Sequence, residues 1–178
     1  MKNIKVLDKT FELYINNNEI TAQIKKISVK LNDDLQGKTP LFLGILNGSF
    51  MFAGELFQHL NINCEISFLK LASYSGTSTS GEVKTLIGLS EDIRNRTVVI
   101  LEDIIDTGTT IENIIKQLKK SEPSEILIAS LLYKSKAYKL NRKIDYFCFD
   151  IPNEFIVGYG LDYNGFGRNL KHIYKIIE

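Results

Sequence analysis

Four short runs of mostly apolar residues limit the possible folds of this chain more than any other feature. They cover residues 41–46, 98–101, 126–132 and 146–150. A strand that is apolar along its length is buried on both faces, as in a parallel sheet covered by helices. Because helical patterns separate these runs, the sequence predicts an α/β fold with a central parallel sheet flanked by helices.

Amphipathic patterns between the runs predict the helices. The predicted helices cover residues 19–35, 50–60 and about 111–118. In the first of them, apolar side chains recur at intervals of three and four residues, which places them on one face. These apolar positions are Ile20, Ile24, Ile27 and Leu31. Pro40 and Pro123 follow the first and third helices, and proline does not continue a helix.

Three further segments are predicted as strands from weaker patterns. Residues 62–74 and 83–89 flank a run of Ser, Gly and Thr at 75–81, which has no apolar side chain and predicts a loop between hairpin strands. Near the end of the chain, residues 172–177 form a short strand-like stretch. The sequence contains no internal repeat and no low-complexity segment.

Length and charge narrow the class of protein. The chain has 178 residues, 44% of them hydrophobic, and a formal net charge of +1, so we expect a single domain over residues 1–178. A near-neutral charge argues against a dedicated nucleic-acid binder, which carries a strongly basic face. No apolar run approaches the roughly 20 residues that cross a bilayer, and the first residues lack the apolar stretch of a signal peptide.

The two cysteines, Cys64 and Cys148, lie in mainly apolar surroundings. A disulfide framework needs more cysteines, and a zinc site needs paired spacings that this sequence lacks. We therefore expect two buried free thiols in a reducing compartment. With no targeting or membrane segment, the sequence predicts a cytoplasmic protein without a membrane partner.

Acidic residues and a glycine-containing turn follow the second apolar run. Ligands of open α/β sheets bind beyond the carboxyl ends of the strands, where residues 102–110 (EDIIDTGTT) are predicted to lie. Residues 106–110 form a turn that opens a helix, so backbone N–H groups and the positive helix end suit a phosphate. Gly108 allows the backbone to approach an anion closely. A plain helix N-cap would explain one acidic residue, but three carboxylates within five residues favour a ligand site.

The three carboxylates, of Glu102, Asp103 and Asp106, repel phosphate and must face another chemical group. Sugar hydroxyls, a metal ion and a base nitrogen are the candidates. A phosphate-binding turn beside acidic side chains describes a ribose-5-phosphate site. Two other phosphate motifs are excluded, because the chain has no Walker A sequence and because Tyr163 replaces the third glycine of a dinucleotide motif after residues 158–160.

Residues 98–110 resemble the phosphoribosyl-pyrophosphate (PRPP) signature of the type I phosphoribosyltransferases. From about residue 41 to the C-terminus, the chain is similar to the hypoxanthine (hypoxanthine-guanine) phosphoribosyltransferase family. The other matching segments are residues 44–50 (GILNGSF), 131–134 (LLYK) and 155–164 (FIVGYGLDYN). The signature alone indicates the superfamily, and the last segment separates the purine enzymes from their relatives.

This resemblance implies the type I phosphoribosyltransferase fold and a magnesium-dependent enzyme of purine salvage. Such an enzyme transfers 5-phosphoribose from PRPP to N9 of hypoxanthine or guanine, giving IMP or GMP and pyrophosphate. The core is expected over about residues 38–150. A small hood, from about residues 1–18 and 151–178, is expected to close over the base. The resemblance also implies a homodimer or homotetramer.

Roles for the acidic and phosphate-binding residues follow from the resemblance. Asp106 is the general acid/base near purine N7. The residues that bind PRPP and its 5′-phosphate are Glu102, Asp103, Asp106, Thr107, Gly108, Thr109 and Thr110. Those that bind pyrophosphate are Leu46, Asn47, Gly48 and Arg168, with a cis peptide bond expected between Leu46 and Asn47. Many relatives have lysine in place of Asn47. The magnesium ligands are Glu102, Asp103 and Asp162.

The resemblance places four residues around the purine. Lys134 donates to O6, Phe155 stacks on the ring, and Ile156 presents backbone groups to the edge of the base. Asp162 is assigned to the same site. Without the resemblance, Lys134 would be read as a surface lysine and the apolar pair as core residues. Ser73 and Tyr74, with the polar run after them, match the lid that covers the reacting centre.

Two alternatives remain open from the sequence. One is a phosphoribosyltransferase for another base, such as xanthine or a pyrimidine; Lys134, Phe155 and Asp162 favour a 6-oxopurine but do not rank hypoxanthine, guanine and xanthine. The other is a non-catalytic regulator that senses nucleotides and binds RNA or DNA. Such a regulator needs a basic stripe, whereas the helical lysines occur in pairs such as those at 25–26 and 119–120.

Overall fold

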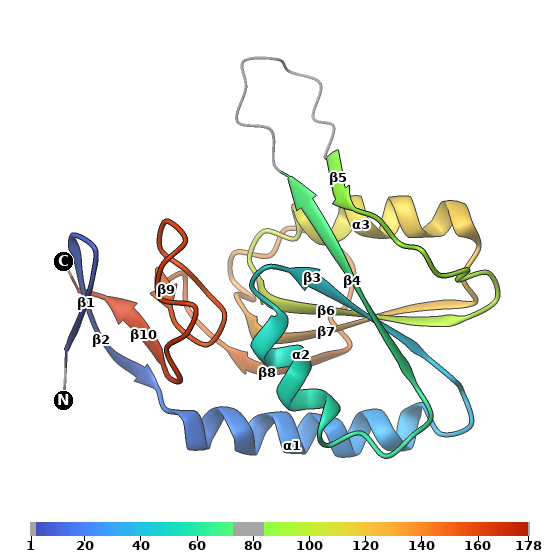
Figure 1. Ribbon diagram of the computed structural model, residues 1–178, viewed down its shortest axis with the longest axis horizontal. Helices are drawn as coiled ribbons and strands as arrows, with labels where there is room; N and C mark the ends of the chain where they lie inside the picture. Colours follow the sequence, from blue (N-terminus) through green and yellow to red (C-terminus); the bar gives the residue numbers. More distant parts are fainter. Residues whose placement is uncertain (1–2, 73–83, 178) are drawn as a thin grey trace.

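The computed structural model describes residues 3–72 and 84–177, and its larger sheet forms the centre of the molecule (Figure 1). The strand order of this sheet is β5-β4-β3-β6-β7-β8. Its strands are β3 (Leu41–Leu46), β4 (Glu65–Ala72), β5 (Lys84–Ile87), β6 (Thr97–Ile105), β7 (Glu125–Tyr133) and β8 (Tyr146–Asp150). Apart from β5, which pairs antiparallel with β4, neighbouring strands are parallel. The predicted α/β fold class is confirmed.

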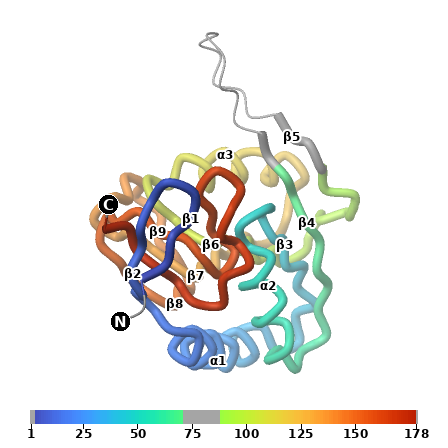
Figure 2. The backbone as a smooth tube through the Cα atoms, turned by 60° about the vertical axis from the view of Figure 1, so that its left-hand side comes forward, coloured from blue at the N-terminus to red at the C-terminus, as the bar shows by residue number. Residues whose placement is uncertain are grey.

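Helices cover both faces of this sheet (Figures 1 and 2). The helices are α1 (Asn17–Asp34), α2 (Phe50–Phe57), α3 (Thr109–Leu118) and the short 3-10 helix η1 (Lys119–Ser121). Side chains alternate between the faces of a strand, so Phe42 packs with α1 and α2 while Leu41 and Leu43 pack with α3. Within the described part of the chain, no helix is both long and apolar enough to cross a membrane.

The predicted element boundaries need small corrections. Helix α1 begins at Asn17, two residues early, because the side chain of Asn16 accepts from Glu19 N at 3.0 Å and Glu19 accepts from Asn16 N at 2.9 Å. This reciprocal capping box satisfies two backbone donors at the helix start. Helix α2 ends at Phe57, three residues before the predicted end, and β4 begins three residues later than predicted, at Glu65.

Strand β6 differs more from the prediction. The apolar run ends at Leu101, but the strand continues to Ile105 and includes Glu102 and Asp103. Its ladder with β7 accounts for the extension, because the parallel pairing continues from Glu102, opposite Ser130, to Ile105. The two acidic residues therefore lie inside a strand, and only Asp106 and the residues after it form the turn.

The two ends of the chain form a second, antiparallel sheet with the order β1-β2-β10-β9. Its strands are β1 (Ile4–Val6), β2 (Lys9–Ile15), β9 (Ile156–Val157) and β10 (Ile173–Ile176). A small core of Val6, Phe11, Val157 and Tyr174 holds it together. The sequence reading recognised β10 but not β1 and β2, although the alternation of apolar and polar residues from Phe11 to Ile15 was a usable signal.

The tail of the chain touches the loop after β3 through two glycines. A Cβ atom on Gly160 would overlap the carbonyl oxygen of Gly48, and Gly160 has a φ of +99°. Both observations require glycine at position 160, because a side chain would meet backbone and because L-residues rarely adopt this conformation. This contact joins the tail to the loop after β3, while Ile15, Ile156 and Ile173 of the second sheet pack into the core of the central sheet.

We expect Gly160→Ala to destabilise the protein by at least about 2 kcal/mol, because it adds both a backbone clash and an unfavourable φ. For a chain of this length, that loss lowers Tm by roughly 4–8 °C. Gly54→Ala is the matched control, because a Cβ at this helical glycine in α2 would meet nothing within 4 Å. Alanine is the better helix former, so the control should raise stability by up to about 1 kcal/mol. Equal Tm values for the two variants would contradict the close contact.

Candidate active site

A pocket of about 590 Å³ lies where β3 and β6 end. Twelve of the residues selected from the sequence line it: Leu46, Asn47, Gly48, Glu102, Asp103, Asp106, Thr107, Gly108, Thr109, Thr110, Asp162 and Arg168. The fold thus gathers the acidic, turn and loop residues around one cavity. The sequence reading missed the other lining residues, which are Ile45, Ile104, Ile105, Ile111 and Asn113.

The turn after β6 has the geometry of an anion site. Gly108 precedes α3 with a φ of +90°, and its carbonyl accepts from Glu112 N at 2.9 Å. The first N–H groups of a helix have no partner within the helix, so those after Gly108 can bind an anion. The hydroxyls of Thr107 and Thr109 lie 3.1 Å apart on the same turn. A Cβ on Gly108 would also crowd the ring of Tyr138, so packing as well as conformation requires this glycine.

Burial controls the charge of the two acidic residues in β6. Glu102 is only 6% exposed, and burial, reinforced by the charge of Asp103, raises its pKa well above the usual value. Burial also raises the pKa of Asp103 to about 6, although a hydrogen bond from Ile104 N at 2.8 Å and the charge of Arg168 pull it down. Ionised carboxylates in such a place gain from hydroxyl donors or a cation supplied by a ligand.

The loop between β3 and α2 is held tightly on two sides. The peptide bond between Leu46 and Asn47 is cis, as the resemblance implied. A Cβ on Gly48 would overlap the carboxylate of Asp103, so this carboxylate packs directly against the loop. Gly160 packs on the carbonyl of Gly48 from the tail of the chain. The loop backbone therefore faces the pocket in one defined arrangement.

Arg168 reaches the pocket from the tail and is anchored there by two contacts. Its guanidinium donates to the carbonyl of Gly160 at 2.7 Å and pairs with Asp162 at 2.6 Å. Asp162 also accepts from Gly165 N at 2.6 Å, which orients its carboxylate. An arginine fixed in this way offers the remaining N–H groups of its guanidinium to an anion in the pocket.

The carboxylates that line the pocket fit a magnesium ion if a substrate supplies further oxygen ligands. In residues 3–72 and 84–177, no group of three or more His, Cys, Asp or Glu side chains is arranged to hold a metal ion. Glu102, Asp103 and Asp162 nevertheless line the same pocket. Magnesium commonly takes one or two protein carboxylates and fills its remaining positions with water and substrate phosphates. These oxygen donors therefore fit magnesium bound together with a phosphate-bearing substrate.

Lys134 adjoins the pocket through Asp106. Its side chain is nearly buried, and the residue is 7% exposed. The Nζ atom donates to Asp106 Oδ2 and to Asn153 Oδ1, at 3.0 Å each. The sequence reading selected Lys134 and Asp106 but missed Asn153. Its position shortly after β8 was a usable signal, because Lys134 follows β7 in a similar way.

The predicted purine-stacking residue, Phe155, is 46% exposed. Its ring centroid lies 6.4 Å from that of Phe11 and 5.8 Å from that of Tyr163. Tyr163 in turn donates its hydroxyl to Asp8 at 2.9 Å. Phe155 is therefore packed against two aromatic rings while nearly half of its surface remains accessible, as a stacking residue requires.

The other predicted residues lie outside the pocket lining or outside the described residues. Ile156 is buried in β9, where it pairs with Lys175 of β10. Lys134 and Phe155 also do not line the 590 Å³ pocket, so Asp162 is the one predicted purine residue among its lining residues. The predicted lid residues, Ser73 and Tyr74, lie outside the residues that the structure describes.

Comparisons with known proteins agree with this arrangement. A family model described as a phosphoribosyl transferase domain matches residues 12–164. A hypoxanthine-guanine phosphoribosyltransferase of Streptococcus pneumoniae is 41% identical over 163 residues, 91% of either chain. One of Streptococcus pyogenes is 43% identical over 157 residues, 88% of this chain and 87% of the relative. The crystal structure of a hypoxanthine phosphoribosyltransferase of Staphylococcus aureus superposes with a TM-score of 0.88 at 36% identity, covering 93% of this chain and 91% of that one.

The similarity spans the central sheet and much of the pocket. The family match begins in β2 and ends two residues after Asp162, so it includes the loop after β3 and the turn after β6. The curated relatives exceed 40% identity over most of both chains. The chain therefore belongs to the phosphoribosyltransferase family and, within it, to the hypoxanthine-guanine phosphoribosyltransferases.

Proposed function

We propose that this protein transfers 5-phosphoribose from PRPP to N9 of hypoxanthine or guanine, giving IMP or GMP and pyrophosphate in purine salvage. The observation that carries the proposal is one pocket with an anion-binding turn, the buried carboxyl of Glu102 beside the half-buried one of Asp103, and an anchored arginine, next to a buried lysine bound to Asp106. The activity named for the relatives that are 41–43% identical supports the same reaction.

PRPP is bound through its two ends and its sugar. The N–H groups and hydroxyls of residues 106–110 bind the 5′-phosphate. Glu102 and Asp103 accept hydrogen bonds from the ribose hydroxyls, which compensates the burial that raises the pKa of both carboxyls. The backbone of Leu46, Asn47 and Gly48 binds the pyrophosphate, together with Arg168. The neutral side chain of Asn47 leaves this task to backbone groups and to the guanidinium.

The reaction breaks the bond between C1′ and the pyrophosphate oxygen and forms a bond between C1′ and purine N9. Positive charge develops on the ribose as the first bond breaks, as in glycoside cleavage. Asp106 takes up the proton that the base loses, at purine N7, and pyrophosphate leaves with the bonding electron pair. A lid at Ser73 and Tyr74 would exclude water, which otherwise captures the ribose.

Magnesium is the proposed cofactor. Glu102, Asp103 and Asp162 would hold the ion together with oxygens of PRPP, because these carboxylates line the PRPP pocket. When bound, magnesium offsets the negative charge that accumulates on the leaving pyrophosphate.

The purine is recognised beside Asp106. The ammonium of Lys134 donates to O6, the accessible face of Phe155 stacks on the ring, and backbone groups at Ile156 meet the edge of the base. Ile156 begins β9 of the second sheet and Phe155 directly precedes it, so we assign residues 1–18 and 151–178 to a hood over the base. Asp162, the fourth residue assigned to the purine, reaches the site from the same tail.

We place the reaction in the cytoplasm and expect a homodimer or homotetramer. Both cysteines are free, and Cys148 is buried; Cys64 is half-buried rather than buried as expected. Burial raises the pKa of both thiols, to about 12 for Cys148, so neither is a reactive thiolate. The exposed large apolar side chains available for subunit contacts include Val29, Phe50, Ile66 and Phe147.

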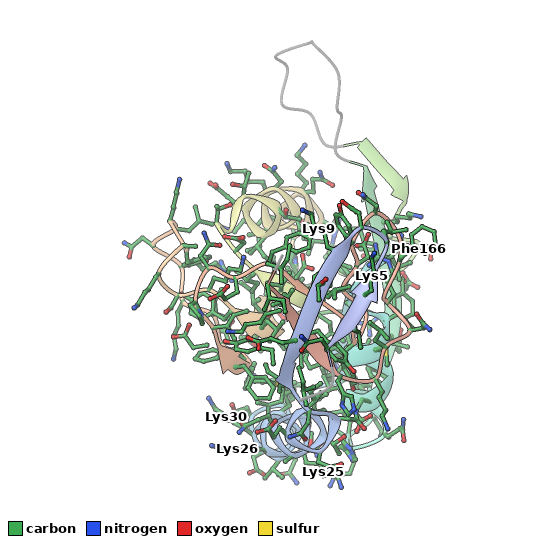
Figure 3. The ribbon with its side chains drawn as sticks, turned by 90° about the vertical axis from the view of Figure 1, so that its left-hand side faces the viewer. Lys5, Lys9, Lys25, Lys26, Lys30 and Phe166 are labelled. Carbon is green, nitrogen blue, oxygen red and sulfur yellow. The ribbon has the colours of Figure 1, made fainter. Side chains whose placement is uncertain are left out.

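The arrangement of the lysines on one side of the molecule argues against the alternative function, a regulator that binds nucleic acid. Figure 3 shows them in two groups, Lys25, Lys26 and Lys30 on α1 and Lys5 and Lys9 on the hairpin of β1 and β2. Lys30 lies over the ring of Tyr146, 4.9 Å from its centroid, and so packs on the protein. Because these lysines form two separate groups, we interpret them as solvated surfaces of α1 and of the hairpin and not as a continuous basic stripe that would bind nucleic acid.

The proposed function predicts nucleotide formation from 6-oxopurines alone. Purified protein is incubated with PRPP and magnesium, separately with hypoxanthine, guanine, xanthine, adenine and uracil, and products are separated by chromatography. We expect IMP or GMP from hypoxanthine or guanine, and no product from adenine or uracil. Product from xanthine would extend the base range, and product from uracil alone would overturn the purine assignment. With no product from any base, retention on RNA or DNA at physiological salt would support the regulator.

Asp106→Asn should keep PRPP binding and lose turnover by about 10²- to 10⁴-fold, because the amide preserves size and hydrogen bonding but cannot take up a proton. The measurement is steady-state kcat with hypoxanthine, beside the Kd of PRPP from calorimetry. Asp33→Asn, a substitution on α1 away from the pocket, is the control for losing one carboxylate. An unchanged kcat in Asp106→Asn would remove this residue from the acid/base role.

The raised pKa of Asp103 predicts that its carboxylate costs stability. With a pKa of about 6 in the folded protein against 3.8 as the ordinary value, the folded state binds the proton more tightly. The stability contribution of Asp103 therefore falls as the pH rises from about 4 to about 6. Asp103→Asn should be more stable than the parent at pH 7.5, by up to about 3 kcal/mol, and inactive.

Thermal unfolding of the ligand-free protein at several pH values tests this prediction. The advantage of Asp103→Asn should shrink as the pH is lowered from 7.5 to 5. Asp33→Asn is the control for the loss of one carboxylate, because Asp33 lies at the exposed end of α1. A variant that is less stable than the parent at pH 7.5 would show that the buried carboxylate is already compensated in the ligand-free protein.

A further inference from the structure

Three neighbouring parallel strands each deliver one polar side chain to the same small region. Asp106 directly follows β6, Lys134 directly follows β7, and Asn153 lies three residues after β8. Strand β7 lies between β6 and β8 in the sheet. The lysine of the middle strand can therefore reach a partner on either side, and its Nζ atom lies 3.0 Å from both Asp106 Oδ2 and Asn153 Oδ1.

The two contacts leave one direction for a ligand. A lysine ammonium has three N–H donors and no acceptor. Asp106 and Asn153 accept from two of these donors. Because the ammonium group is tetrahedral, fixing two N–H bonds also fixes the direction of the third. A lysine side chain has several rotatable bonds and gives up considerable rotamer freedom when it is fixed. Two acceptors on opposite sides hold the ammonium before a ligand arrives, whereas one acceptor would leave it free to swing about a single contact.

The backbone around Asn153 is itself fixed to the end of β7. Ile151 N donates to Tyr133 O at 2.8 Å, and Glu154 N donates to Pro152 O at 2.8 Å, which sets the turn that carries Asn153. Asp150, the last residue of β8, accepts from the hydroxyl of Ser135 at 2.7 Å. Since Ser135 follows Lys134 directly, this hydrogen bond ties the loop after β7 to the end of β8.

We propose that Asn153 is a positioning residue for Lys134, and that it sets the affinity of the site for the 6-oxo group of the purine. This role rests on the proposed function, because it acts through the lysine that donates to O6. Asn153 does not itself touch the base. It holds the ammonium away from an exclusive ion pair with Asp106, so that one N–H remains available to O6 and Asp106 remains available to N7.

The chemistry of the asparagine side chain suits this task. Its Oδ1 atom accepts a hydrogen bond without adding a second negative charge beside Asp106. A carboxylate at this place would keep the acceptor, whereas alanine would remove it and leave Asp106 as the one acceptor that the described structure gives the ammonium. The ammonium would then move toward Asp106, because opposite charges attract strongly in a partly buried site.

The test compares Michaelis constants for the two substrates. We expect Asn153→Ala to raise the KM of hypoxanthine roughly tenfold, which is the size expected when the hydrogen bond from the Lys134 ammonium to O6 is lost. The KM of PRPP should change less than twofold. Asn153→Asp should restore the KM of hypoxanthine to within about threefold of the parent, because it keeps the acceptor. Glu154→Gln, one residue further along the same turn, is the control and should leave both constants unchanged.

A double-mutant cycle separates positioning from a general structural role. Lys134→Ala alone should raise the KM of hypoxanthine, and adding Asn153→Ala to it should cause no further loss, because the second residue acts through the first. A further tenfold loss in the double variant, or an equal rise in the KM of PRPP in Asn153→Ala, would overturn the proposal. Tm values for all variants exclude unfolding as the cause.

Failure of the proposed function would give a different result. A parent protein that forms no nucleotide from any 6-oxopurine would overturn the reaction itself. A parent protein that turns over hypoxanthine, with an Asn153→Ala variant of unchanged KM, would overturn only the role of Asn153.

Discussion

Burial of the parallel sheet between two helical layers is the constraint on which the rest of this structure depends. The apolar runs of β3, β6 and β7 must be covered on both faces, and α1, α2 and α3 cover them. Parallel strands place their carboxyl ends at one edge, where no apolar layer is needed. The loop at Asn47, the turn at Asp106 and the ammonium of Lys134 meet at this edge. The polar site is thus a consequence of how the apolar residues pack.

This origin explains which features the sequence alone reveals. A strand buried on both faces has a nearly pure apolar sequence, and a phosphate-binding turn needs glycine and hydroxyl residues in a short segment, so both leave local patterns. The extension of β6 through Glu102 and Asp103 leaves none, because it depends on the ladder that β7 provides. Strand β2 does leave an alternating pattern from Phe11 to Ile15, but its pairing with β10 joins residues about 160 positions apart, which no local pattern reveals.

Contacts between strand ends are equally invisible in the sequence. The position of Asn153 after β8 places it at this edge of the sheet, but that its side chain meets Lys134 depends on β7 and β8 being neighbours in the sheet. The raised pKa of Asp103 is likewise a product of the assembled site, because the loop at Gly48 packs against this carboxylate while the charge of Arg168, from the tail, opposes the shift. Local patterns identify candidate residues, and the fold decides their neighbours and their charge.

The second sheet, built from both ends of the chain, has a consequence for biosynthesis. The phosphate turn and Lys134 belong to the first three-quarters of the sequence, whereas Phe155, Asp162 and Arg168 come late. Strand β2 is made among the first residues but has to wait for β10 before it gains its second neighbour. A nascent chain therefore contains the turn after β6 and Lys134 before Phe155, Asp162 and Arg168 have been made. The lining of the pocket is complete only when the tail has left the ribosome and β10 has paired with β2.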